Sequence, residues 1–236
     1  MTFSEIGLNK NLQKAIINLG FETPTPIQKE SIPYLLENET DLIALAQTGT
    51  GKTAAFGLPV LNKVEVDRKL PQAIILAPTR ELCLQIAKDM DTFAKYIKGL
   101  KITPVYGGAS IVPQMRSLKS GTQVVVGTPG RVIDLINRKA LRLQDIEFVV
   151  LDEADEMLNM GFKDDLDTIL AETPEEKQTL LFSATMPKEV MRLSKNYMRS
   201  PKTIEVARRN EGAKNIEHHY YMVQARDRYK ALRRIC

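Results

Sequence analysis

Cysteine and long apolar runs are scarce in this sequence. Its two cysteines, Cys83 and Cys236, have no metal-ligand spacing and suggest no disulfide framework, which favours a reducing compartment. No stretch approaches the roughly 18 apolar residues that a membrane-spanning helix needs. Residues 1–7 lack a basic region followed by an apolar run, the pattern of an export signal. We therefore expect a cytoplasmic protein with no membrane segment.

Charge is unevenly distributed along the 236 residues, of which 43% are hydrophobic and 26% charged, as in ordinary folded domains. Residues 1–185 carry 20 basic and 24 acidic side chains, whereas residues 186–236 carry 13 basic and 5 acidic ones. The basic C-terminal part fits either an anionic partner or a solvated helix surface, and charge alone does not separate the two.

A glycine-rich segment lies between a strand pattern and a helix pattern. The apolar run 42–46 predicts a buried strand and residues 52–64 predict a helix. Gly49 and Gly51 would let successive backbone N–H groups approach phosphate oxygens, with the positive end of the helix behind them. The alternative is an unrelated glycine-rich turn, because Ala46 stands where the general phosphate-loop pattern begins with glycine.

Two adjacent acidic residues complete the pattern of a nucleotide triphosphatase. The run 148–152 predicts a buried strand ending at Asp152, and parallel sheets bind ligands at such carboxyl ends. Lys52 would reach the β and γ phosphates, while Thr53 and Asp152 would hold Mg²⁺. Glu153 would orient and deprotonate the attacking water. A solvated helix cap is the alternative for the acids, but two elements in the right order favour the enzyme.

Strand and helix patterns alternate along the chain. The expected strands are 42–46, 73–77, 102–106, 123–127, 148–152, 179–183 and 203–206. The expected helices are 4–19, 26–37, 52–64, 80–97, 111–119, 129–137, 154–172 and 187–198. This alternation predicts an α/β fold with a mostly parallel central sheet and helices on both faces.

The composition changes after residue 206. Residues 207–215 are small, polar and charged, as in a linker. We expect a first domain over residues 1–206, a linker over 207–215 and the truncated start of a second domain over 216–236. The last helix pattern runs to the final residue without a stop signal, so we expect the natural protein to continue.

Further motifs extend the pattern across residues 3–185. They are the segments 20–28 (with Phe3 upstream), 78–82, 107–108, 128–131, 152–155 and 183–185. In this order they resemble the motifs of the DEAD-box RNA helicases of superfamily 2, whose name is spelled by Asp-Glu-Ala-Asp at 152–155. Ala46 is the usual first residue of the phosphate loop in that family. The resemblance implies a RecA-like P-loop domain.

The resemblance also implies an ATP site. The expected ATP-binding residues are Phe21, Gln28, Gln47, Thr48, Gly49, Thr50, Gly51, Lys52 and Thr53. The Gln28 amide can pair with the amine and a ring nitrogen of adenine, an arrangement that guanine does not satisfy. Phe21 offers a flat face to the base, and Phe3 resembles the family's supporting aromatic. The alternatives are plain core packing for the two phenylalanines and a solvated helix start for Gln28.

Three loops that follow strands are suited to a phosphate backbone. The expected RNA-binding residues are Pro78, Thr79, Arg80, Gly108, Thr128, Pro129, Gly130 and Arg131. Such groups recognise the backbone and not the bases, so binding should be independent of sequence and weakened by salt. The preference for RNA over DNA follows from the resemblance alone. Helix capping is the alternative for these loops.

By resemblance, the ATP site is expected to be coupled to the RNA site through Asp155, Ser183 and Thr185. The alternative for Ser183 and Thr185 is a simple helix cap before Pro187.

The expected function is an RNA-dependent ATPase that unwinds short RNA duplexes, with a second RecA-like domain of the same chain supplying arginines. This chain alone should be nearly inactive. The alternatives are an ATP-gated RNA clamp and a different P-loop enzyme such as a small-molecule kinase.

Overall fold

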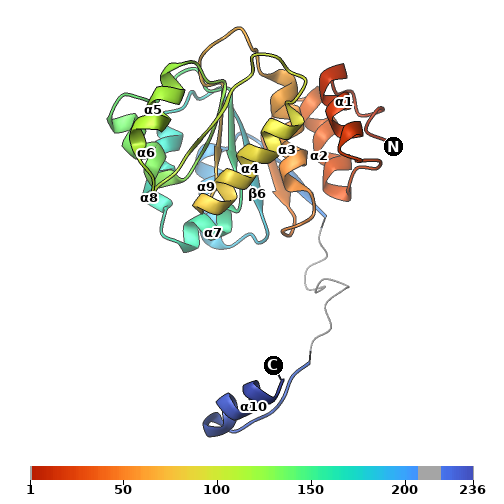
Figure 1. Cartoon of the computed structure of the whole chain (residues 1–236), viewed down its shortest axis with the longest axis vertical. Coiled ribbons are helices and arrows are strands. Elements are labelled where there is room, and N and C mark those ends of the chain that lie inside the picture. Colours follow the sequence, from red (N-terminus) through yellow and green to blue (C-terminus); the bar gives the residue numbers. More distant parts are fainter. Residues whose placement is uncertain (1, 207–218, 236) are drawn as a thin grey trace.

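The computed structural model describes residues 2–206 and 219–235 and contains a seven-stranded sheet with helices on both faces (Figure 1). The strands are β1 (Leu42–Leu45), β2 (Ala73–Leu76), β3 (Ile102–Val105), β4 (Val124–Gly127), β5 (Phe148–Leu151), β6 (Gln178–Ser183) and β7 (Lys202–Glu205). The helices are α1 (Lys10–Asn18), α2 (Pro26–Glu37), α3 (Lys52–Lys63), α4 (Arg80–Phe93), α5 (Ile111–Lys119), α6 (Pro129–Asn137), α7 (Ala154–Asn159), α8 (Lys163–Ala171), α9 (Lys188–Tyr197) and α10 (Arg228–Ile235). The expected α/β fold class is confirmed.

The strands lie in the order β3-β4-β2-β5-β6-β1-β7, and each neighbouring pair is parallel. All carboxyl ends therefore meet at one edge of the sheet, as the site prediction requires. The central strands are apolar along their whole length because helices bury both of their faces. Ala46 and Asp152 each lie one residue beyond the end of their strand and still donate a backbone hydrogen bond to the neighbouring strand. The expected strands include these two residues, so they are one residue longer at this end than β1 and β5.

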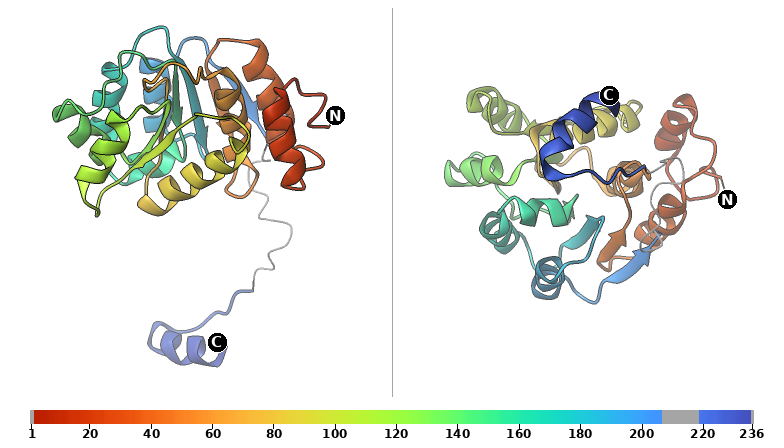
Figure 2. Two further views of the ribbon diagram at one scale, coloured as in Figure 1. Left: turned by 45° about the horizontal axis from the view of Figure 1, so that its top comes forward. Right: turned by 90° about the horizontal axis from the view of Figure 1, so that it is seen from below.

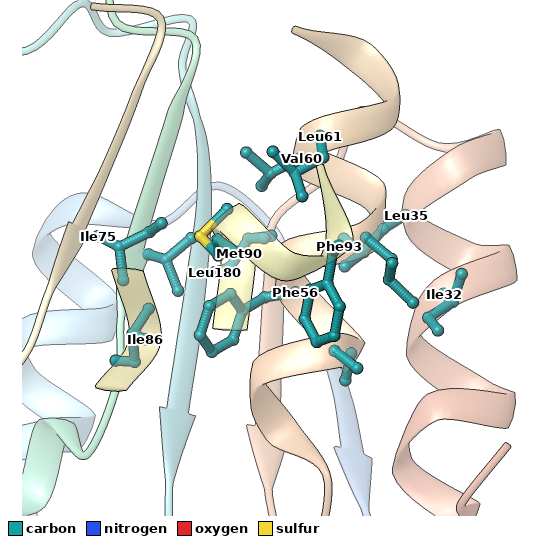
Figure 3. Close-up of a cluster of buried hydrophobic side chains, with 14 of the residues drawn as sticks. Ile32, Leu35, Phe56, Val60, Leu61, Ile75, Ile86, Met90, Phe93 and Leu180 are labelled. Carbon is teal, nitrogen blue, oxygen red and sulfur yellow. The ribbon is translucent and has the colours of Figure 1, made fainter. Parts of the chain in front are cut away.

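The helices form two layers with separate hydrophobic cores. Side chains of α1 to α4 pack on one face of the sheet, and side chains of α5 to α9 pack on the other (Figure 2). In the first core, Phe56 of α3, Met90 of α4 and Leu180 of β6 lie together (Figure 3). The ring of Phe56 also meets that of Phe182 edge-on, with centroids 5.1 Å apart. This packing fixes the helix that follows the phosphate loop against the sheet.

Three expected helices differ from the structure by several residues. The pattern over 80–97 ends early, because α4 stops at Phe93. The pattern over 154–172 is divided into α7 and α8, because Gly161 between them has a φ of +86°, a left-handed conformation that ends the first helix. The pattern over 4–19 becomes a helix only after Asn9, whose side chain accepts hydrogen bonds from the N–H groups of Asn11 and Leu12.

The C-terminal part is described only in part. The expected linker 207–215, together with residues 216–218 and 236, lies outside the described residues. Helix α10 within 219–235 has no buried residue. The domain boundaries therefore stay a prediction. Among the described helices, none is both long enough and apolar enough to cross a bilayer.

Candidate functional site

The loop between β1 and α3 has the backbone conformation expected for a phosphate loop. Gly49 has a φ of +81° and Gly51 a φ of +90°, a region that residues with a Cβ rarely adopt. Gly51 is the cap residue that precedes α3, so the helix N-terminus opens onto the loop. Thr50 Oγ1 donates to the backbone oxygen of Gln47 over 2.7 Å, which closes the turn.

The lysine of this loop meets the acid pair at the end of β5. Lys52 Nζ lies 3.8 Å from Asp152 Oδ1, and both residues are buried. Burial raises the pKa of Asp152 to about 6, and the nearby charge of Lys52 opposes this shift. The sequence prediction that these two distant segments share one site thus agrees with their placement.

Glu153 is held beside the phosphate loop in a strained conformation. Its φ is +53°, which is uncommon for a residue with a long side chain and is typical of functional sites. Its backbone N–H donates to Asp152 Oδ1 over 3.0 Å. Thr48 Oγ1 of the phosphate loop lies within 3.4 Å of Glu153 Oε1 and donates to it. The turn therefore aims the Glu153 carboxylate toward the loop.

A cavity of about 370 Å³ opens at this point. It is lined by all of the expected ATP-binding residues except Gln47 and Thr50, and by the acid pair: Phe21, Gln28, Thr48, Gly49, Gly51, Lys52, Thr53, Asp152 and Glu153. The sequence did not predict the contribution of α4, from which Leu82, Gln85 and Asp89 line the cavity. Their spacing of three and four residues is the helical signal that would have grouped them.

Gln28 is buried at 4% exposure and contacts the phosphate loop directly, so the solvated alternative is wrong. Its Oε1 accepts from Thr25 N over 2.9 Å, and its Nε2 donates to the backbone oxygen of Gly51 over 3.0 Å. One N–H and one lone pair of the amide stay available for a base. Phe21 is partly exposed, with its ring 6.1 Å from that of Phe3 and 6.4 Å from that of Phe93 between centroids.

The Thr53 hydroxyl and the Asp152 carboxylate, which were expected to hold a cation, are two of the hard oxygen donors that line the cavity. In the described part of the chain, no group of three His, Cys, Asp or Glu residues could hold a metal ion by itself. This sparse donor set fits Mg²⁺, which keeps several waters and binds mainly through substrate phosphates.

The loops after β2, β3 and β4 are joined to one another, and their expected RNA-binding residues differ in access. Arg80, Gly108 and Gly130 are exposed, whereas Pro78 and Pro129 are buried. Buried prolines do not offer side chains to a ligand, so their part in the loops is to shape the backbone.

The Thr79 and Arg131 side chains have internal partners, whereas the Thr128 side chain makes no capping hydrogen bond. Thr79 Oγ1 accepts from Leu82 N over 3.2 Å, so the capping alternative holds for this hydroxyl. Thr128 is the residue that precedes α6. The Arg131 side chain is 11% exposed, and its guanidinium donates to Gln114 Oε1 and to the backbone oxygen of Ala109.

The three expected coupling residues are in contact. Asp155 Oδ2 accepts from Thr185 N over 3.0 Å and from Thr185 Oγ1 over 2.7 Å, and Asp155 N donates to Ser183 Oγ over 3.3 Å. Although burial raises the pKa of Asp155, the hydrogen bonds from Thr185 and Ser183 outweigh it and hold this pKa below its usual value. These bonds tie the end of β6 to the start of α7.

Comparisons with known proteins agree with this geometry. The family model described as DEAD/DEAH box helicase matches residues 25–193. The chain is 48% identical over 234 residues to an ATP-dependent RNA helicase DeaD of Haemophilus influenzae, covering 99% of this chain and 38% of that protein. It is 49% identical over 234 residues to a DEAD-box ATP-dependent RNA helicase CshA of Bacillus anthracis, covering 99% and 44%.

Two solved structures share the fold. A DEAD box protein from Methanococcus jannaschii superposes with a TM-score of 0.85 at 46% identity, covering all of this chain and 63% of that one. A hypothetical ATP-dependent RNA helicase from Sulfolobus tokodaii gives a TM-score of 0.77 at 36% identity, covering 84% and 57%. The chain thus spans less than half the length of the two curated relatives named above.

Proposed function

Because the chain belongs to the DEAD/DEAH box helicase family, we propose that it is the ATP-binding half of an ATP-dependent RNA helicase. The observation that carries this proposal is the meeting of Lys52, Thr53, Asp152 and Glu153 around one cavity at the carboxyl edge of the sheet. The segments that follow β1 and β5, which are remote in sequence, supply these residues. The relatives named above are RNA helicases.

In the proposed reaction, the phosphate loop and Lys52 hold the β and γ phosphates of ATP. Thr53 and Asp152 would hold Mg²⁺, which when bound would neutralise phosphate charge and favour attack at the γ phosphate. Glu153 takes the proton from the attacking water, and its 3.4 Å contact with Thr48 supports this orientation. Gln28 and Phe21, which also line the cavity, would select adenine.

The loops after β2, β3 and β4 would bind the RNA backbone. Exposed Arg80, Gly108 and Gly130 support this part of the proposal, since they present a cation and accessible backbone. Affinity should fall with salt and depend little on base sequence. The contacts among Asp155, Ser183 and Thr185 would transmit the state of the ATP site to the neighbouring domain.

A second RecA-like domain would follow residues 207–215 and supply arginines to the γ phosphate. On this view residues 1–236 alone hydrolyse ATP negligibly, and strong RNA-dependent turnover by this segment would contradict it. The cytoplasmic location inferred from cysteine usage stays a prediction.

The proposal is tested with the full-length protein by measuring ATP hydrolysis with and without RNA, together with release of a short duplex. Glu153→Gln should keep ATP and RNA binding but lower turnover by about a hundredfold or more. Glu156→Gln, an exposed acid one turn further along α7, is the matched control and should behave as wild type. Unimpaired turnover in Glu153→Gln would remove that residue from its role. RNA-stimulated hydrolysis without strand release would indicate an RNA clamp.

A further inference from the structure

Gln114 in the middle of α5 is a buried polar side chain with partners in two different loops. Its Nε2 donates to the backbone oxygen of Tyr106 over 3.2 Å, and its Oε1 accepts from the N–H of Tyr106 over 3.2 Å. Tyr106 directly follows β3, an edge strand of the sheet. The amide therefore pairs with Tyr106 as a neighbouring strand would, and it fixes where the β3–α5 loop begins.

The same Gln114 oxygen also accepts a hydrogen bond from Arg131 Nη1 over 2.9 Å. Arg131 Nη2 donates to the backbone oxygen of Ala109 over 3.0 Å, and Arg131 Nε lies 3.9 Å from Asp134 Oδ2. The guanidinium is thus surrounded by protein acceptors and links the start of α6 to the β3–α5 loop. In this arrangement Arg131 acts inside the protein, where a backbone phosphate would have to displace these partners.

The loop after β2 contacts the β3–α5 loop through Arg80 and Tyr106. The guanidinium carbon of Arg80 lies 4.9 Å from the centroid of the Tyr106 ring. Arg80 Nη1 donates to the backbone oxygen of Gly108 over 3.4 Å. Arg80 is exposed and begins α4. The loop after β2 is therefore connected to the loop after β3 through Tyr106, and the loop after β4 is connected to it through Arg131 and Gln114. Gln114 is the buried residue that contacts both Tyr106 and Arg131.

We propose that Gln114 is a positioning residue that locks these three loops into one preformed surface for the RNA backbone. The inference rests on the proposed function, since it assumes that the surface binds RNA. A flexible set of loops would have to be ordered on binding, which weakens affinity, whereas a locked set is ordered beforehand. Glutamine suits the position because one amide offers both the donor and the acceptor that Tyr106 needs.

The test compares Gln114→Met and Gln114→Glu with wild type in the 236-residue chain. Methionine keeps the length of the side chain and removes all three hydrogen bonds. Glutamate keeps the acceptor for Arg131 but loses the donor to the Tyr106 oxygen. The matched control is Gln123→Met, because Gln123 is also buried and also bridges two backbone groups, Lys101 N at 2.9 Å and Val66 O at 2.8 Å. Gln123 precedes β4, so it lies at the amino ends of the parallel strands, whereas the three loops lie at their carboxyl ends.

Three quantities are measured: hydrogen exchange of the loop amides, affinity for a fluorescent single-stranded RNA at low salt, and affinity for a fluorescent ADP analogue. In Gln114→Met we expect faster exchange at 105–110 and 128–131 and a loss of RNA affinity of about five- to tenfold, corresponding to one lost hydrogen bond or slightly more. ADP affinity should stay within about twofold. Gln114→Glu should lose less RNA affinity, and Gln123→Met should keep the wild-type RNA affinity.

The outcomes separate this inference from the proposed function. Unchanged loop exchange in Gln114→Met overturns the inference whatever the RNA result. Faster exchange with wild-type RNA affinity also overturns it, since Gln114 would then stabilise the fold without serving the surface. An equal RNA loss in Gln123→Met overturns it too, because the effect would follow from general instability. If wild type itself does not bind RNA, the RNA role of Gln114 fails together with the proposal that these loops bind RNA, whereas the proposed ATP site is judged separately by the ADP affinity.

Discussion

Replacing Gly51 by alanine tests how the adenine-side glutamine and the phosphate loop depend on each other. At a φ of +90° an alanine costs about 1–2 kcal/mol of backbone strain. Its Cβ would also lie 2.4 Å from Gln28 Nε2 and 3.2 Å from Thr25 Oγ1, so the Gln28 amide must move. That displacement breaks the 3.0 Å bond to the Gly51 oxygen, worth about 1 kcal/mol, and disturbs a buried amide. We expect the free energy of unfolding to fall by about 2–4 kcal/mol in total.

Gly49→Ala is the matched control, because Gly49 lies in the same loop and has a φ of +81°. Among the described residues, a Cβ at Gly49 would have no neighbour within 4 Å, so only the strain remains. Urea denaturation of the two variants, without nucleotide, measures the difference directly. Gly51→Ala should be less stable than Gly49→Ala by about 1–2 kcal/mol, which is the cost of displacing the Gln28 amide.

A third variant assigns that difference to Gln28. Shortening Gln28 to alanine in the Gly51→Ala background removes the clash, so the double substitution should cost about 1–2 kcal/mol less than the sum of the single ones. Equal stabilities of Gly51→Ala and Gly49→Ala, or strictly additive effects in the double variant, would refute the reasoning. Either result would mean that Gln28 does not constrain the loop.

Two further predictions concern the acid pair and the sheet. Burial raises the pKa of Asp152 to about 6, so the carboxylate expected to hold Mg²⁺ is present above that pH and is lost as the pH falls through it. Calorimetric affinity for a magnesium nucleotide should therefore drop about tenfold per pH unit below 6, whereas an affinity that is constant down to about pH 5 would contradict this. Gly127→Ala would place a Cβ 2.5 Å from Val132 Cγ2 and 2.9 Å from Val105 Cγ2. We expect it to lower the free energy of unfolding by about 1–3 kcal/mol, and an unchanged urea midpoint would show that the contact relaxes freely.

Much of the fold was predictable because strand and helix patterns alternate without ambiguity. Runs such as 73–76 and 124–127 are apolar at every position, which is typical of strands buried on both faces. Helix ends were less predictable. The break at Gly161 depends on one left-handed residue inside a continuous helical pattern, and periodicity alone does not detect such a residue.

The candidate site was predictable where backbone geometry demands particular residues, as at Gly49, Gly51 and the acid pair. It was less predictable where a side chain has two plausible partners. Arg131 looks like a phosphate ligand in sequence, yet its guanidinium meets Gln114 and Ala109. Gln114 belongs to no motif recognised in the sequence, and its importance depends on contacts between elements that only the folded chain brings together.

The order of strands in the sheet explains how one domain can serve two ligands. The loops proposed to bind RNA follow β2, β3 and β4, whereas the residues proposed for the ATP phosphates and magnesium follow β1 and β5, and the proposed coupling residues Ser183 and Thr185 lie at the end of β6. Each set of three strands is contiguous in the sheet, so the two sites lie side by side and meet at the β2–β5 boundary. Helix α4 follows β2 and spans this boundary, because it begins at Arg80 beside the RNA loops and lines the nucleotide cavity with Leu82 and Asp89. Helix α4 therefore contributes residues to both proposed sites, and sequence order alone gives no sign of this shared element.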